Sequence, residues 1–118
     1  MAVTTQTTLI PDGLPNPSSP QFAFQEVTAA GAITIPAGIV IINGTTLAVT
    51  LAAPRHSGQV LFISSENASA HTLDLATAGV NAGSADIGTF GGAAGDGVIL
   101  VSYDGNWYDF ANTNVTWA

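Results

Sequence analysis

Short apolar segments recur from Gly31 to the end of the chain. Residues 45–51 (TTLAVTL) and 71–75 (HTLDL) alternate apolar with polar, which is typical of strands with one buried face. Residues 38–42 (GIVII) and 59–64 (QVLFIS) are mostly apolar, which predicts strands buried on both faces. β-branched residues dominate, and no segment keeps a 3.6-residue period over three turns. The pattern predicts an all-β fold, with further strands at 32–35, 87–90, 98–103, 106–110 and 113–117.

Two dipeptides predict tight turns between these strands. Asn43-Gly44 is a hairpin-type turn signal. Asp104-Gly105 is flanked by apolar runs and predicts a hairpin with a two-residue loop. That loop would pair Val101 with Tyr108 and Ile99 with Phe110.

Residues 1–25 have a different composition from residues 26–118. The stretch from Leu9 to Phe22 holds four prolines, and proline fixes φ and lacks the backbone N–H. We therefore expect residues 1–25 to form an extended arm and residues 26–118 to form the β domain. Apolar residues in the arm either fold back onto the domain or dock on a partner. We predict partner docking through Leu9, Ile10, Leu14, Phe22 and Phe24.

The expected architecture is a compact antiparallel β-sandwich or barrel with an extended Pro-rich N-terminal arm. No exact internal repeat is present, which argues against a solenoid. Residues 77–97 contain seven glycines, and we expect this long segment to be pinned, with a short strand at 87–90.

The charge balance excludes several classes of partner. The 118-residue chain has one basic side chain, Arg55, and a net charge of −7. Nucleic acid and anionic membrane surfaces are therefore not expected partners, because binding to phosphates requires Lys and Arg. Charged residues make up only 8% of the chain, so its surface consists largely of small uncharged residues, which suits packing against other protein. There is no cysteine, no apolar run of membrane-spanning length and no signal-peptide pattern at the start.

No set of side chains assembles a catalytic or metal site. His71 shares parity with the apolar positions of its strand and is expected to be a structural histidine, and His56 lies in a polar turn. Asp96 and Asp104 adjoin glycines and are typical turn residues. Together with Asp86 they lack the regular ligand spacing of a calcium loop. We expect no enzyme activity, no cofactor and no metal.

The aromatic residues near the C-terminus have two interpretations. Trp107, Tyr108, Tyr103 and Trp117 could stack on sugars or serve in core and interface packing. The expected hairpin places Trp107 opposite Ser102 and on the other face from Tyr108. We predict that Trp107 belongs to the core.

Four stretches resemble small phage structural proteins of the capsid decoration (cement) or head-fibre kind. They are GAITIP (31–36), TLAVTLAAP (46–54), ASAHTLDL (68–75) and FGGAAGDGVILVSYDGNWY (90–108). The region from Gly31 to Tyr108 is about two-thirds of the chain, and the arm lies outside it.

The resemblance implies a homotrimeric all-β module on the outer capsid surface of a virion, made in the bacterial host cytoplasm. It would bind the major capsid protein and stabilise contacts between neighbouring subunits. The alternative is a receptor-binding or fibre-tip module that recognises host surface glycan. A small hydrolase is a third class, for which no nucleophile–base pair can be assembled.

Overall fold

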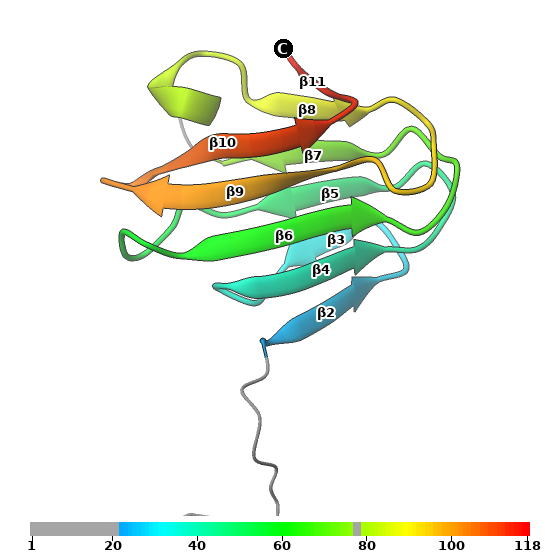
Figure 1. Cartoon of the computed structure of the whole chain (residues 1–118), viewed down its shortest axis with the longest axis horizontal. Helices are drawn as coiled ribbons and strands as arrows, with labels where there is room; N and C mark the ends of the chain where they lie inside the picture. Colours follow the sequence, from blue (N-terminus) through cyan, green and yellow to red (C-terminus); the bar gives the residue numbers. More distant parts are fainter. Residues whose placement is uncertain (1–21, 77–78) are drawn as a thin grey trace, which may run out of the picture.

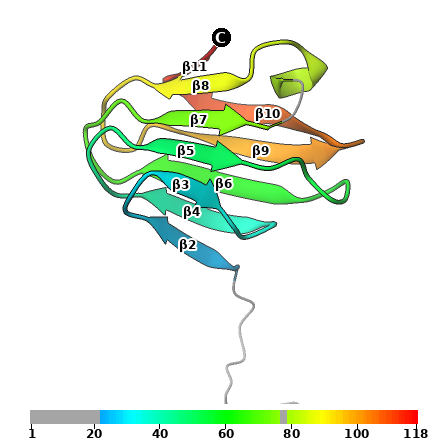
Figure 2. The same cartoon turned by 180° about the vertical axis from the view of Figure 1, so that it is seen from behind.

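Two five-stranded sheets pack face to face in the computed structural model, which describes residues 22–76 and 79–118 (Figures 1 and 2). The first sheet has the order β10-β9-β6-β4-β2, and the second has the order β11-β8-β7-β5-β3. A short 3-10 turn, η1, spans Val80–Ala82. The predicted all-β sandwich is confirmed. The strands of the first sheet are β2 (Phe24–Val27), β4 (Gly38–Ile42), β6 (Val60–Ser65), β9 (Gly97–Tyr103) and β10 (Asn106–Thr113), and those of the second are β3 (Gly31–Ile33), β5 (Ala48–Leu51), β7 (Thr72–Leu75), β8 (Ile87–Phe90) and β11 (Val115–Trp117).

The chain alternates between the two sheets through its first six described strands. β2, β4 and β6 pair in parallel in one sheet, and β3, β5 and β7 pair in parallel in the other. Each turn of this coil therefore lies beside the one before it, as in a short solenoid. β8 and β9 then pair antiparallel to β7 and β6, with β11 and β10 outside them.

Two predictions about strand pairing were wrong. The sheets are mixed rather than antiparallel, because six strands follow the coiled path. Asn43-Gly44 does not form a hairpin, since it joins β4 to β5 in the opposite sheet. The absence of a sequence repeat did not exclude coiling, because a coil needs only apolar residues that face inward in each strand.

The core lies between the sheets and consists of the inward-facing residues of both. Leu73 and Leu75 of β7 are buried as predicted. Trp107 is 1% exposed, and its Nε1–H donates to the Ala52 carbonyl at 3.0 Å. Trp107 is therefore a core residue, as predicted, and the other large, fully buried side chains include Phe90, Ile42, Leu61 and Leu100.

The hairpin between β9 and β10 has the predicted turn but a different register beyond it. Tyr108 pairs with Val101 as expected, and Asp104 and Gly105 both have positive φ. A bulge between Asp109 and Ala111 then shifts the register. Ile99 consequently pairs with Ala111 instead of Phe110, so the predicted Ile99–Phe110 pair was wrong. Phe110 is left 71% exposed.

Gln25 connects the edges of the two sheets at the end where β2 and β3 lie. Its Oε1 accepts from the Thr34 N–H at 2.7 Å, and its Nε2 donates to the Ala32 carbonyl at 3.1 Å. This side chain thus forms hydrogen bonds with backbone groups at the free edge of the second sheet. β2 begins at Phe24, within the range expected for the arm.

Gly97 allows β9 to approach β6 closely. A Cβ at this position would overlap the Ile63 carbonyl oxygen. The preceding residue, Asp96, is buried, and its Oδ2 accepts from the Ala93 N–H at 2.9 Å. Part of the glycine-rich segment is thus held by hydrogen bonds and close packing, and its predicted strand is β8.

Candidate functional site

The outward-facing side of the first sheet carries a continuous row of apolar side chains. The strand registers align Phe24 with Ile39, Ile39 with Phe62, Phe62 with Ile99, and Ile99 with Ala111. The row therefore crosses all five strands. Neighbouring Cβ atoms in such a row lie about 4.5–5.5 Å apart, so the side chains form one surface.

A second row lies beside the first. Val60 pairs with Val101, and Val101 pairs with Tyr108. All three side chains are half-buried. We call these two rows, together with Phe22 and Ile41, the apolar face.

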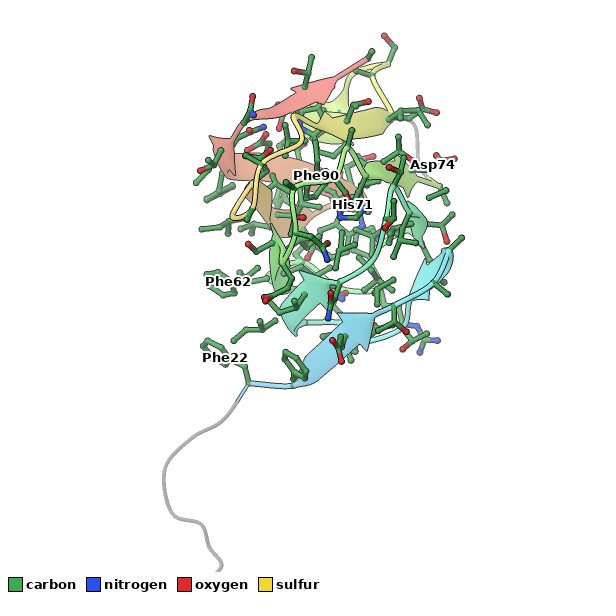
Figure 3. All side chains as sticks on the ribbon, turned by 90° about the vertical axis from the view of Figure 1, so that its right-hand side faces the viewer. Phe22, Phe62, His71, Asp74 and Phe90 are labelled. Atoms are coloured by element: carbon green, nitrogen blue, oxygen red, sulfur yellow. The ribbon has the colours of Figure 1, made fainter. Side chains whose placement is uncertain are left out.

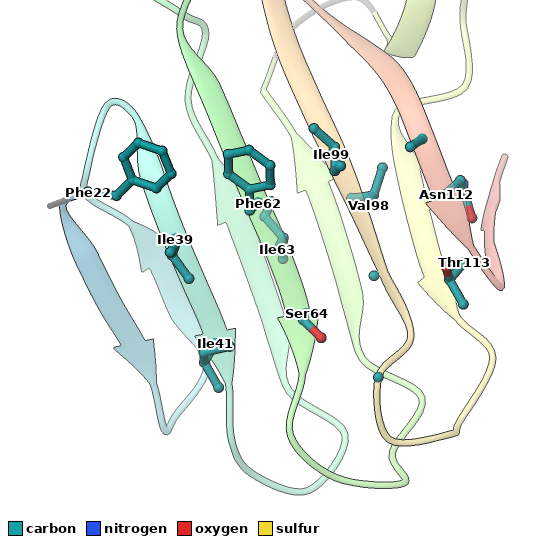
Figure 4. A pocket seen from close by; sticks show the side chains of 13 residues that line it. Phe22, Ile39, Ile41, Phe62, Ile63, Ser64, Val98, Ile99, Asn112 and Thr113 are labelled. Atoms are coloured by element: carbon teal, nitrogen blue, oxygen red, sulfur yellow. The ribbon is translucent and has the colours of Figure 1, made fainter. Parts of the chain in front are cut away.

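A groove with a volume of ≈ 370 Å³ lies in the apolar face (Figure 4). Phe22 and Phe62 lie side by side at one side of the groove, with ring centroids 5.9 Å apart and an angle of 10° between the rings. Ile39, Ile41 and Ile99 contribute aliphatic side chains to its lining. The lining of the groove is therefore mainly apolar, with Ser64, Asn112 and Thr113 as its polar side chains.

The apolar face explains why the interpretation of two strands was wrong. Residues 38–42 and 59–64 were expected to be buried on both faces. Instead, Val40 and Leu61 point inward and are fully buried, whereas Ile39 is half-buried and Phe62 is 37% exposed. Nothing in the described chain covers the outer positions of these strands completely.

Charge is nearly absent from this surface. Glu26 lies on the edge strand β2, in register with Ile41, Ser64, Gly97 and Thr113 along the next row. Its Oε2 accepts a hydrogen bond from Asn43 Nδ2 at 2.8 Å. The face itself offers no group that could hold a phosphate or a metal ion.

Two of the five predicted docking residues contribute to the apolar face. Phe22 lines the groove and Phe24 begins the five-strand row, and they are 65% and 61% exposed. The other three, Leu9, Ile10 and Leu14, lie outside the described residues. Partner docking by these five residues stays a prediction.

The sequence interpretation missed the apolar residues on the central strands. Ile39, Ile41 and Phe62 belong to apolar runs that were expected to be buried on both faces. Such runs do contain the signal, because a strand with an apolar residue at every position must present some of them on the second face. Only the packing of the sheets shows that this second face stays open.

His71 is a structural residue of the interior, as predicted. Its Nδ1 accepts from the Leu47 N–H at 3.0 Å, which places the ring proton on Nε2, 3.1 Å from Ser65 Oγ. Ser65 Oγ in turn donates to the Asn67 carbonyl at 2.6 Å. Desolvation by burial lowers the pKa of His71 below its ordinary value of 6.5. The ring therefore supports the loop before β5 as a neutral group.

The C-terminal aromatic residues do not form a common platform. Trp107 is buried, and Trp117 Nε1–H donates to Asp109 Oδ2 at 2.9 Å. Tyr103 is 63% exposed and makes an edge contact with Tyr108, with ring centroids 6.2 Å apart. Tyr103 is the exposed member of the four residues considered for sugar stacking.

Within residues 22–76 and 79–118, no three His, Asp or Glu side chains gather in a way that could hold a metal ion. No helix in the described parts of the chain is long and apolar enough to cross a membrane.

No protein-family model matches this chain, and no curated protein matches it significantly.

Proposed function

We propose that this chain is a structural protein of a phage particle, a capsid decoration or cement protein that binds the outer surface of the head through its apolar face. Its partner would be the major capsid protein, whose neighbouring subunits it would hold together. The observation that carries this proposal is the five-strand apolar row on the outside of a sheet that folding does not require to be apolar. The resemblance of residues 31–108 to decoration and head-fibre proteins supplies the biological setting.

The chemistry of the surface supports a protein partner. An extended apolar patch on a soluble domain is typical of a protein–protein contact. The absence of basic residues from the face, and the single Arg in the whole chain, argues against nucleic acid. Apolar packing against protein needs neither charge nor a cofactor.

The size of the face sets the strength of one contact. Its rows cover an area on the order of 300 Å², from a strand spacing of about 4.8 Å and a rise of about 3.3 Å per residue. At about 25 cal/mol per Å² this burial is worth roughly 7 kcal/mol before the cost of association. A single face would therefore bind weakly. A trimer, which we also propose, would present three faces and gain avidity.

A binding experiment with the particle tests this function. Heads of the encoding phage, stripped of this chain, are incubated with the wild-type protein, with Phe62→Asn and with Thr72→Asn. Phe62 and Thr72 both face outward, from β6 of the first sheet and β7 of the second. We expect Phe62→Asn to weaken binding by about tenfold or more, the equivalent of 1.4 kcal/mol, and Thr72→Asn to bind as the wild type does.

If purified particles lack the chain, or if Phe62→Asn binds heads as tightly as Thr72→Asn, the apolar face is not the attachment surface of a decoration protein.

Exposed Tyr103 keeps the receptor-binding or fibre-tip alternative open for testing. An exposed aromatic ring can stack on a sugar. Many copies on the head support decoration, whereas a few copies at the tail, with glycan binding lost in Tyr103→Ala, support the fibre tip. A quantitative gel of purified particles and a glycan-binding assay separate the two.

A further inference from the structure

We infer that the groove in the apolar face is a docking site for the proline-rich segment of this same chain, residues 14–20 (LPNPSSP). The segment would cross the first sheet from Phe22 at the β2 side toward Thr113 on β10. This contact is a property of the isolated protein and does not depend on the proposed role in a virion.

Phe22 connects the described domain to the proline-rich segment. Phe22 precedes the edge strand β2, yet its ring stacks on Phe62 of β6, two strands away in the sheet order. The side chain therefore reaches across β4 and lies over the groove (Figure 4). The described chain thus begins at a residue whose side chain already lies in the groove.

The proline-rich segment is long enough to cross the groove. The groove extends across the sheet to Ala111 and Thr113 on β10. Thr113 is in register with Glu26, four residues beyond Phe22. Four strand spacings of about 4.8 Å and an offset of four residues at about 3.3 Å each make this crossing roughly 23 Å. Leu14 is eight residues from Phe22, and eight residues at about 3.1 Å each span roughly 25 Å in the extended proline conformation. Residues 14–20 are thus long enough to place Leu14 near Thr113.

The composition of the segment suits an apolar groove. It has no charged residue, so docking in an apolar groove carries no cost for desolvating a charge. Proline-rich segments characteristically bind grooves lined by aromatic rings, because their extended conformation is already restricted. Pro15, Pro17 and Pro20 lack backbone donors and could not add to the edge of β2 as a regular strand. Side-chain contact with the face is the binding mode that remains.

The segment is more available to its own groove than to that of another molecule. A short tether keeps the local concentration of a linked segment on the order of millimolar. At micromolar protein the intrachain contact therefore prevails. Because the same face carries the proposed contact with a capsid subunit, that contact requires the segment to leave the groove; this consequence alone rests on the proposed function.

A pair of engineered thiols in the full chain tests the contact, since the protein has no cysteine of its own. The test pair is Leu14→Cys with Thr113→Cys, at the far side of the groove. The control pair is Leu14→Cys with Thr89→Cys, an exposed position facing outward on β8 of the other sheet. Both pairs are oxidised at micromolar protein in a glutathione buffer, and intrachain disulfide formation is followed by mass spectrometry and non-reducing gel.

We expect the test pair to close about tenfold faster or more than the control pair, reflecting the higher local concentration at the groove. Adding Phe62→Asn to the test pair should reduce its rate to that of the control, while circular dichroism shows that each variant is folded. Equal rates for the two pairs in the folded protein would overturn the proposal. Interchain disulfides that form faster as protein concentration rises would show that the groove takes the segment of a second copy, which also overturns it.

Discussion

The outer faces of the two sheets differ, although their inner faces are built alike. The first sheet shows Phe24, Ile39, Phe62 and Ile99 in one row across its strands, with Ala111 at the end. The corresponding row of the second sheet begins at its edge strand and is largely polar or small, with Ala32, Thr50, Asp74 and Ile87 in register. Figure 3 shows Phe22 and Phe62 on one side of the sandwich and Asp74 on the other.

This contrast separates the side chains that the core requires from those that it does not. Alternate positions of β5 and β7 meet the requirements of the core, with Val49, Leu51, Leu73 and Leu75 inside and small or polar residues outside. The first sheet has inward-facing apolar residues of the same kind and, in addition, the outward-facing residues of the apolar face. The core does not require these outward-facing apolar side chains, which is why we propose the apolar face as a contact surface.

Truncating a residue of the core that the two sheets share should have the largest effect on stability, because both sheets pack on that core. Trp107→Ala deletes a fully buried indole and its hydrogen bond to Ala52. We expect a loss of about 3–5 kcal/mol in the free energy of unfolding, measured by chemical denaturation. An unchanged free energy of unfolding in Trp107→Ala would contradict the contribution of this residue to the core.

Lowering the pH should reduce the free energy of unfolding through His71 in the interior. His71 has a lowered pKa in the folded protein, so the unfolded chain binds its proton more readily. The contribution of His71 to the free energy of unfolding is therefore fully present above the unfolded pKa of 6.5. It falls as the pH decreases below that value, by up to about 1.4 kcal/mol per pH unit, until the folded pKa is reached. Denaturation at several pH values between 5 and 7.5 measures this slope.

Two histidine variants serve as controls for the pH profile. His71→Gln removes the titrating group and should flatten the profile over this range. His56→Gln changes an exposed turn residue and should keep the profile of the wild type. A slope that persists in His71→Gln would assign the pH dependence to other groups.

The outer faces themselves should contribute least to stability. Phe62→Asn removes a ring that is 37% exposed, and we expect it to cost about 1 kcal/mol or less, because its burial is only partial. Thr72→Asn on the second sheet should stay within about 0.5 kcal/mol of the wild type. Both values come from thermal and chemical unfolding. If Phe62→Asn loses as much stability as Trp107→Ala, the apolar face is part of the core and its role as a contact surface fails.

The sequence alone determined the local geometry of this protein. Alternation placed Leu73, Leu75 and Val49 inward, and parity placed His71 with them. Asp104-Gly105 determined a hairpin with Trp107 opposite Ser102, because a two-residue loop leaves one register near the turn. These features depend on neighbours in the chain, so periodicity and turn chemistry were enough to predict them.

The tertiary structure decided which strands pair and which second face stays open. Alternation assigns each strand an inner side but does not name its neighbour, so the parallel coil and the crossing at Asn43-Gly44 could not be predicted from it. The bulge that displaces Phe110 also depends on how β10 packs as a whole. The apolar runs of β4 and β6 are equally compatible with two buried faces and with one buried face and one partly open face. Only the assembled sandwich, which covers Val40 and Leu61 but leaves Ile39 and Phe62 partly open, distinguishes these, because burial depends on what lies across the sheet rather than along the chain.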